Sequence, residues 1–175
     1  MKIAITGANS SVGMNLLAQV DQQPDLHFIA GVRSESARQA LPDSPQIASV
    51  CIRYDDVDAL AESLDGADCV VHLAGILIEG KQSKYREANV DATRSVIDAA
   101  KRIGAKHVVF ISVVGADSKS SNAYFRSKGE AEDIVAANRF QVFVRVDCLD
   151  TGDRCSRGYV DTQHLNITLS RKDEL

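Results

Sequence analysis

Short apolar runs and amphipathic stretches alternate along this chain of 175 residues, and this alternation constrains the fold more than any other feature. The apolar runs are nearly continuous in valine, isoleucine, alanine and phenylalanine, which is typical of strands covered by helices on both faces. We predict strands at residues 3–6, 26–32, 48–52, 68–73, 107–112 and 140–146, and helices at residues 13–20, 34–40, 57–64, 84–103 and 122–137. Strands and helices in this order predict an α/β protein with a doubly wound parallel sheet.

The chain divides into one long α/β region and a short polar end. Residues 1–146 carry the alternating pattern and are predicted to form a single domain, which is a usual size for one hydrophobic core. Residues 147–175 lack a clear amphipathic helix, and only residues 164–169 have a weak strand pattern. We therefore predict a polar tail with at most one extra strand.

Composition and charge exclude several classes of function. The net charge of -4 offers no electrostatic footprint for nucleic acid. No apolar run approaches the roughly 20 residues that cross a bilayer, and Met1 leads directly into a predicted strand, so a cytoplasmic protein is expected. Cys51 and Cys69 fall in strand-like runs and are expected to be buried thiols. Because no cysteine or histidine pair has metal-ligand spacing, no metal site is predicted.

A glycine-containing turn follows the first predicted strand. Gly7 stands at the turn itself, and Gly13 stands where a helix would pack closely on the strand. Backbone amides at the start of that helix would point at a pyrophosphate. Ser10 replaces the middle glycine of the usual nucleotide-binding pattern, so a plain strand–helix turn remains an alternative. The position of the turn, directly after an N-terminal apolar strand, favours nucleotide binding.

Tyr124 and Lys128 are four residues apart in a predicted helix, so their side chains project from one face. An ammonium beside a phenol favours the phenolate and moves a pKa of about 10 toward the range used in acid–base catalysis. The alternative is that the pair belongs to an ordinary helix surface.

Six motifs in this order characterise a known family: TGA at residues 6–8, SVG at 11–13, VVHLAG at 70–75, NVDAT at 89–93, VVFISVVGA at 108–116 and YFRSKGE at 124–130. The chain resembles an atypical or extended short-chain dehydrogenase/reductase of the NAD-dependent epimerase/dehydratase superfamily. It is most similar to the branch that includes the complex I accessory NAD(P)-binding subunit. The resemblance covers residues 1–146 and implies an NAD(P)-binding Rossmann domain.

The resemblance also implies the residues that would hold the dinucleotide. The pyrophosphate would lie against Gly7, Asn9, Ser10, Ser11, Val12 and Gly13, and the adenosine ribose against Leu73, Ala74 and Gly75. Asp55 or Asp56 would accept a hydrogen bond from the adenine amino group. The second strand ends at Arg33, with no acid to hold a ribose 2′-hydroxyl, so NADP is favoured over NAD. A merely solvated Arg33 is the alternative.

For chemistry, the resemblance implies that Tyr124 exchanges a proton with a carbonyl or alcohol and that Lys128 lowers its pKa and binds the nicotinamide ribose. Ser112 is the candidate for polarising the substrate oxygen. Relatives often use a second adjacent hydroxyl, and this chain has Val113 there. His72 and Asn89 are expected to be structural. The chain is thus predicted to be an NAD(P)-dependent oxidoreductase or epimerase-like enzyme.

The region after the sixth predicted strand departs from the family. Relatives continue with an Arg-Pro turn and a substrate-binding lobe, whereas here Arg145 is followed by Val146 and a polar stretch. A truncated substrate lobe is therefore expected. The alternative function is a non-catalytic NAD(P)-binding module, structural or redox-sensing, of the complex I accessory-subunit type. The expected partners are the cofactor, an unidentified small substrate, and a second copy or a larger complex.

Overall fold

The computed structural model describes residues 1–22, 24–138, 142–146 and 168–170. Its elements are, in chain order, β1 (Lys2–Thr6), α1 (Ser11–Leu17), η1 (Val20–Gln22), β2 (His27–Val32), α2 (Glu35–Gln39), β3 (Ile47–Cys51), α3 (Val57–Ser63), β4 (Cys69–His72), η2 (Arg86–Asp91), α4 (Ala92–Arg102), β5 (His107–Val113), α5 (Ala123–Ala136), β6 (Val142–Val146) and β7 (Thr168–Ser170). Within this part of the chain, no helix has the length and apolar character that spanning a membrane requires.

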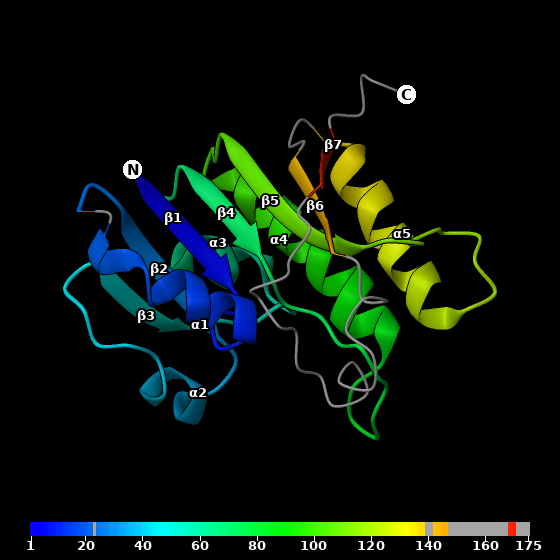
Figure 1. Cartoon of the computed structure of the whole chain (residues 1–175), viewed down its shortest axis with the longest axis horizontal. Helices are drawn as coiled ribbons and strands as arrows, with labels where there is room; N and C mark the ends of the chain where they lie inside the picture. Colours follow the sequence, from blue (N-terminus) through cyan, green and yellow to red (C-terminus); the bar gives the residue numbers. More distant parts are fainter. Residues whose placement is uncertain (23, 139–141, 147–167, 171–175) are drawn as a thin grey trace.

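The strands form one sheet in the order β3-β2-β1-β4-β5-β6-β7 (Figure 1). The first six strands pair in parallel, and β7 pairs antiparallel with β6. The direction of winding reverses between β1 and β4, the point at which open α/β sheets bind ligands at the carboxyl ends of their strands. The predicted doubly wound parallel sheet is confirmed.

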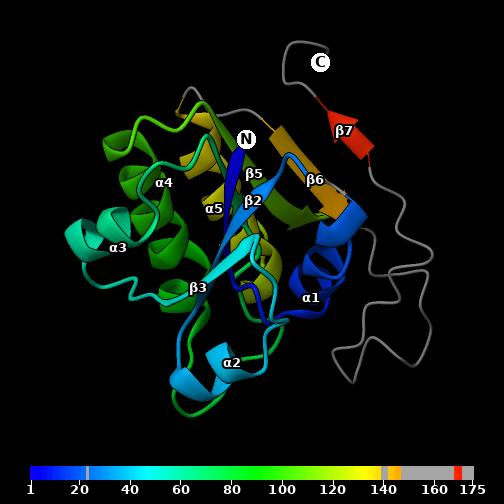
Figure 2. The same ribbon diagram turned by 90° about the vertical axis from the view of Figure 1, so that its left-hand side faces the viewer.

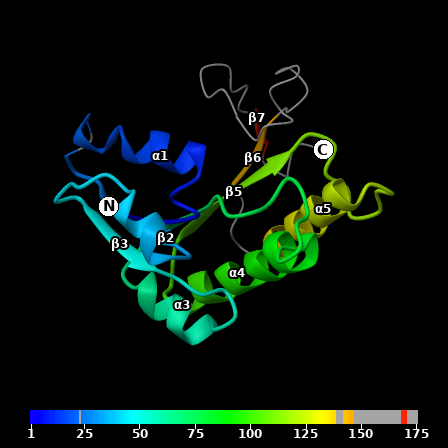
Figure 3. The same ribbon diagram turned by 90° about the horizontal axis from the view of Figure 1, so that it is seen from below.

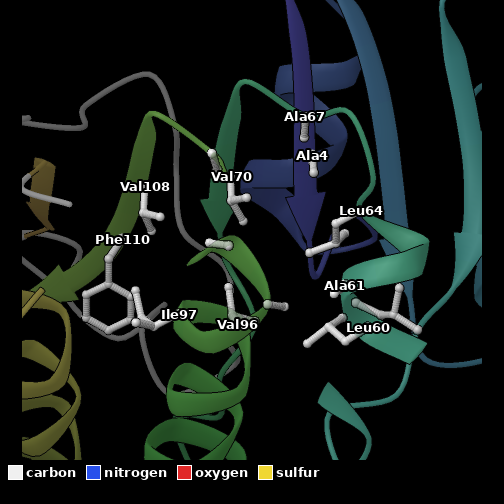
Figure 4. Packing of buried hydrophobic residues seen from close by; sticks show 14 of the residues in the cluster. Ala4, Leu60, Ala61, Leu64, Ala67, Val70, Val96, Ile97, Val108 and Phe110 are labelled. Carbon is white, nitrogen blue, oxygen red and sulfur yellow. The ribbon is translucent and has the colours of Figure 1, made fainter. Parts of the chain in front are cut away.

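Helices cover both faces of the sheet. Figure 3 shows α1 on one side and α3, α4 and α5 on the other. Successive strand residues point to opposite faces, so Ala4 joins the core under α3 and α4, whereas Ile5 joins the core under α1. In the larger core, Leu60 of α3 and Leu64 at its C-cap lie near Val96 of α4 (Figure 4). These two cores hold the carboxyl ends of the strands in fixed positions.

Two predictions from the pattern need correction. Cys51 is exposed, not buried, because it is the last residue of β3, the edge strand of the sheet (Figure 2). The helix predicted at residues 84–103 is a six-residue π-helix, η2, followed by α4. Residues 139–141 and 147–167 lie outside the described residues. The predicted domain boundary at residue 146, and the start of each of two predicted strands, at residues 140–141 and 164–167, therefore stay predictions.

The helix ends follow the capping chemistry that the sequence indicates. Ser10, Ser34, Asp56 and Asn122 each accept a backbone hydrogen bond at the N-terminus of α1, α2, α3 and α5, respectively. Gly104 follows α4 with a φ of 68°, and Ala105 N donates to Ala100 O at 3.0 Å. A glycine in this conformation ends a helix without steric cost.

Candidate functional site

Two adjoining cavities of about 280 and 400 Å³ lie at the carboxyl ends of the central strands. Both cavities are lined by the turn after β1 and by the segment after β4, that is, by Asn9, Ser10, Leu73, Ala74, Gly75 and Ile76. They therefore form one crevice across the point where the sheet reverses its winding.

The turn after β1 needs both of its glycines. Gly7 has a φ of 76°, and a Cβ there would lie 2.7 Å from Ala74 N. A Cβ on Gly13 would lie 2.4 Å from Ala8 O. Ser10 Oγ accepts from Gly13 N at 3.2 Å and caps α1. The turn, the close packing and the helix start are therefore arranged as the sequence pattern predicted.

Arg33, Tyr54 and Glu87 line the smaller cavity but not the larger one. The Tyr54 hydroxyl is buried and has no hydrogen-bond partner among the described residues. Burial raises the pKa of Tyr54 to about 12, so the group is a neutral phenol. Asp55, which was predicted to meet the adenine, instead pairs with Arg53 at 3.1 Å in an exposed position.

Asp56 lies just after Asp55, and its side chain accepts from Ala59 N at 3.0 Å and caps α3. Neither aspartate is among the residues that line the two cavities in the described part of the chain. Tyr54, which precedes them, lines the smaller cavity instead. The contact of an aspartate with the adenine therefore stays a prediction.

The larger cavity brings together Ser112, Tyr124 and Lys128. Ser112 lies near the end of β5, whereas Tyr124 and Lys128 lie one turn apart on α5. Asn122 Oδ1 accepts from Tyr124 N at 2.9 Å, which places the tyrosine in the first turn of that helix. The two elements therefore bring the three predicted catalytic side chains to one cavity.

Lys128 is 8% exposed and points inward. Its ammonium donates to Ile111 O at 2.7 Å and lies 4.3 Å from the centre of the Phe110 ring. Both contacts come from β5, and a cation over an aromatic face is attracted to it. Lys128 is therefore tied to the strand that carries Ser112.

The Ser112 hydroxyl is fully buried and has no hydrogen-bond partner among the described residues. A buried hydroxyl without a partner is rare, because its loss of hydration is not compensated. Val113, the next residue, is 6% exposed and lines the same cavity. Ser112 is thus the hydroxyl that this strand offers beside Tyr124.

Asn89 connects the segment after β4 to α5. Its side-chain amide accepts from Ile76 N at 2.8 Å and donates to Ile76 O at 3.2 Å and to Ser127 Oγ at 3.0 Å. Ser127 Oγ in turn donates to Tyr124 O at 2.7 Å. Asn89 lies in the π-helix η2, and such segments are frequent at functional sites. It also lines the larger cavity.

His72 is buried beneath the crevice in a directed chain of hydrogen bonds. Thr93 Oγ1 donates to Asn89 O at 2.6 Å, so this hydroxyl accepts from His72 Nε2, 3.1 Å away. His72 Nδ1 then accepts from Thr6 Oγ1 at 2.6 Å. Burial, followed by the charge of Lys128, lowers the pKa of His72 to about 3. The histidine is neutral and fully partnered, which agrees with its expected structural position.

The crevice thus contains most of the residues that the sequence singled out. Of the predicted site residues, those that line at least one cavity are Gly7, Asn9, Ser10, Ser11, Val12, Arg33, Leu73, Ala74, Gly75, Ser112, Tyr124 and Lys128. Gly13 lies behind the wall, and Asp55 lies on the surface. The sequence analysis missed Tyr54, Ile76 and Leu77, which follow strands, and Glu87, which lies in η2, because none of the four belongs to a recognisable motif.

Fold and crevice define the class of protein: a doubly wound α/β chain whose ligand crevice lies at the turn after its first strand. The sequence profile of the NAD(P)H-binding family matches residues 7–173, so the chain belongs to that family. The predicted NAD(P)-binding family and the predicted doubly wound fold are confirmed. The more specific assignment to the complex I branch stays a prediction.

Curated relatives carry different names. An uncharacterized sugar epimerase, YhfK of Bacillus subtilis (strain 168), is 24% identical over 143 residues, which are 79% of this chain and 67% of that protein. The NAD-dependent glucose-6-phosphate dehydrogenase of Haloferax volcanii is 28% identical over 112 residues, 63% of this chain and 42% of that protein. Uncharacterized protein Rv2047c of Mycobacterium tuberculosis is 30% identical over 112 residues, 64% of this chain but 12% of that protein.

Solved structures with the same fold also extend beyond this chain. UDP-glucuronic acid 4-epimerase from Bacillus cereus, in complex with NAD, superposes with a TM-score of 0.64 at 20% identity, covering 78% of this chain and 52% of that one. Pen from Bacillus thuringiensis superposes with a TM-score of 0.67 at 24% identity, covering 78% of this chain and 46% of that one. The present chain spans about half of each. These similarities establish the fold.

Proposed function

We propose that this chain binds NADP(H), or less tightly NAD(H), along the crevice and acts as an oxidoreductase on a carbonyl or alcohol. The observation that carries the proposal is the meeting of Ser112, Tyr124 and Lys128 at one cavity that continues into the turn after β1. The adenosine half would lie in the smaller cavity and the nicotinamide half in the larger one.

The residues of the crevice fit a dinucleotide. Gly7, Asn9 and Ser10 line the smaller cavity, so a pyrophosphate can approach the backbone of the turn from that side. At the two ends of the crevice, the buried hydroxyls of Tyr54 and Ser112 have no partner within the described chain. Each is a hydrogen-bonding group that a bound molecule can satisfy.

The chemistry of the chain itself would be proton transfer. When bound, the nicotinamide ring would donate or accept a hydride at C4. In the reduction, the Tyr124 hydroxyl gives its proton to the substrate oxygen, and in the oxidation the phenolate takes it back. The Lys128 ammonium stabilises that phenolate, and Ser112 donates a hydrogen bond to the same substrate oxygen.

Arg33 supports the preference for NADP. Its guanidinium belongs to an exposed side chain at the end of β2 that lines the smaller cavity. An Arg pairs well with a phosphate through two parallel hydrogen bonds. Glu87 lines the same cavity from η2 rather than from the end of β2. An acid at the end of β2 would hold the ribose 2′-hydroxyl of NAD but would repel the 2′-phosphate of NADP. An arginine without such an acid at the end of β2 therefore supports NADP.

Titration of the protein with NADPH and NADH, followed by nicotinamide fluorescence, tests the binding step, and the chain contains no tryptophan to interfere. Replacing Arg33→Ala is expected to weaken NADPH binding by about tenfold to a hundredfold, the value of a hydrogen bond to a charged group. NADH binding should change little, and Arg38→Ala on the neighbouring helix is the matched control. Failure of both cofactors to bind would refute the proposal.

The catalytic step is tested by Tyr124→Phe, which removes only the hydroxyl. Oxidation of NADPH with a panel of carbonyl compounds should fall by about 10²-fold or more, the usual contribution of a general acid. Cofactor affinity should stay the same in that variant. Turnover that survives the loss of the hydroxyl would remove Tyr124 from the mechanism.

A second candidate function is a cofactor-binding module without turnover. The observation that favours it is Val113, which lines the larger cavity at the position where relatives often carry the second hydroxyl. If this alternative is right, NADPH binds but no carbonyl compound is reduced. Replacing Val113→Ser would then restore turnover only if the missing hydroxyl were the cause.

A further inference from the structure

Three exposed apolar side chains lie in the segments that follow β4 and β5. Apart from Met1, the exposed large hydrophobic residues of the described chain are Leu77, Ile78 and Val114, with exposures of 38%, 72% and 49%. Leu77 and Ile78 belong to the loop that follows β4, and Val114 follows β5. Because β4 and β5 are parallel neighbours, these loops leave the sheet at the same edge. Of the three, Leu77 also lines the larger cavity, so it presents apolar surface to a molecule bound there.

Part of the lining of the larger cavity is apolar. Val12, Ile76, Leu77 and Val113 line it together with the polar groups of Ser112, Tyr124 and Lys128. Among its described lining residues, Lys128 alone carries a formal charge, and that ammonium already donates to Ile111 O. The smaller cavity differs, because Arg33 and Glu87 line it. The crevice therefore has a charged end and an apolar end.

Tyr85 holds the apolar wall beside the proton donor. Its hydroxyl donates to Leu77 O at 2.9 Å, and its backbone N donates to Glu79 Oε1 at 2.9 Å. Its ring centre lies 5.8 Å from that of Tyr124 in a tilted contact. One side chain thus connects the loop that carries Leu77 to the ring of Tyr124.

We propose that the larger cavity takes a carbonyl compound with an apolar body, that Leu77 is its specificity-determining wall, and that Tyr85 positions this wall. This inference rests on the proposed function. The carbonyl oxygen would meet Ser112 and Tyr124, and the apolar body would cover Leu77 and Val113. In the reduction, the carbonyl carbon would gain a hydride from the reduced nicotinamide, and the carbonyl oxygen would gain the proton of the Tyr124 hydroxyl. An alcohol and an oxidised nicotinamide result.

The test measures binding without turnover. Protein loaded with oxidised NADP cannot reduce a ketone, so calorimetric titration with 2-octanone reports the affinity of the cavity alone. Dihydroxyacetone and UDP-glucose serve as small polar and nucleotide-sugar probes. We expect 2-octanone to bind at least about tenfold more tightly than either probe, with a negative heat-capacity change that marks apolar burial.

Variants at the wall sharpen the result. Leu77→Ser should weaken 2-octanone binding about tenfold or more, because a leucine that the bound ketone covers contributes about that much to the affinity. Leu77→Met keeps an apolar side chain of similar size and should change the affinity by less than about threefold. Tyr85→Phe, which keeps the ring and loses the hydroxyl bond to Leu77 O, should weaken 2-octanone binding and leave NADP binding unchanged.

The failures can be told apart. If NADP does not bind, the proposed function and this inference fall together. If NADP binds but dihydroxyacetone or UDP-glucose binds more tightly than 2-octanone, only the inference is overturned. The same holds if Leu77→Ser leaves the affinity for 2-octanone unchanged.

Discussion

His72 should make this protein lose stability in mild acid. The imidazole is buried between Thr6 and Thr93, and its pKa is lowered from 6.5 to about 3. The folded state therefore holds this group neutral where the unfolded chain would protonate it. Stability from this source is fully present above the unfolded pKa and is lost as the pH falls from 6.5 toward 3.

Near neutral pH, the loss in the free energy of unfolding hardly depends on the pKa of His72 in the folded state. Between about pH 7 and about pH 5 the unfolded histidine takes up its proton while His72 in the folded state does not. Each pH unit below the unfolded pKa then lowers the free energy of unfolding by about 1.4 kcal/mol. We expect a contribution of roughly 2 kcal/mol over that interval from this one group.

Urea denaturation at several pH values, followed by far-UV circular dichroism, measures the effect in the protein without cofactor. His72→Gln is the comparison, because the amide side chain is neutral at every pH and retains hydrogen-bonding groups. Protonation of carboxylates destabilises both proteins alike, so it cancels in the difference between them. The variant should lose about 2 kcal/mol less than the parent between those two pH values. Equal losses in the two proteins would refute a buried neutral His72.

Three further predictions follow from other buried groups and close contacts. Thr93→Val leaves His72 Nε2 without its acceptor and should lower the free energy of unfolding by about 1–3 kcal/mol, whereas Thr93→Ser keeps the hydroxyl and should cost less than half as much in urea denaturation. Gly129→Ala places a Cβ 2.1 Å from Ser118 N and should lower the melting temperature, because the cost of overpacking is about 1–3 kcal/mol; Gly80→Ala, where no atom lies within 4 Å, is the control and should not lower it. Tyr54→Phe removes a buried hydroxyl without a partner, so the unfolding free energy of the cofactor-free protein should stay constant or rise by up to about 1 kcal/mol, and a marked drop would show that the hydroxyl has a partner.

The candidate site was predictable where local sequence carries the chemistry. Gly7 and Gly13 had to be glycines because backbone atoms approach them closely, and the spacing of Tyr124 and Lys128 brought both to one cavity. Ser112 was predictable from its place at the end of β5. Tyr54 was missed in favour of Asp55, although the two are neighbours, because no local pattern indicates which of them turns inward after an edge strand.

Local sequence patterns and the tertiary structure determine different features of this protein. The sequence by itself determined the alternation of strands and helices, the turn after β1 and the helix that carries Tyr124, since each depends on periodicity or on residues within one turn. Only the tertiary structure decided that Cys51 is exposed, that Asn89 lies in a π-helix and bridges to Ser127, and that Tyr85 holds Leu77 beside Tyr124. These contacts depend on strand order and on the register between elements, which no local pattern encodes.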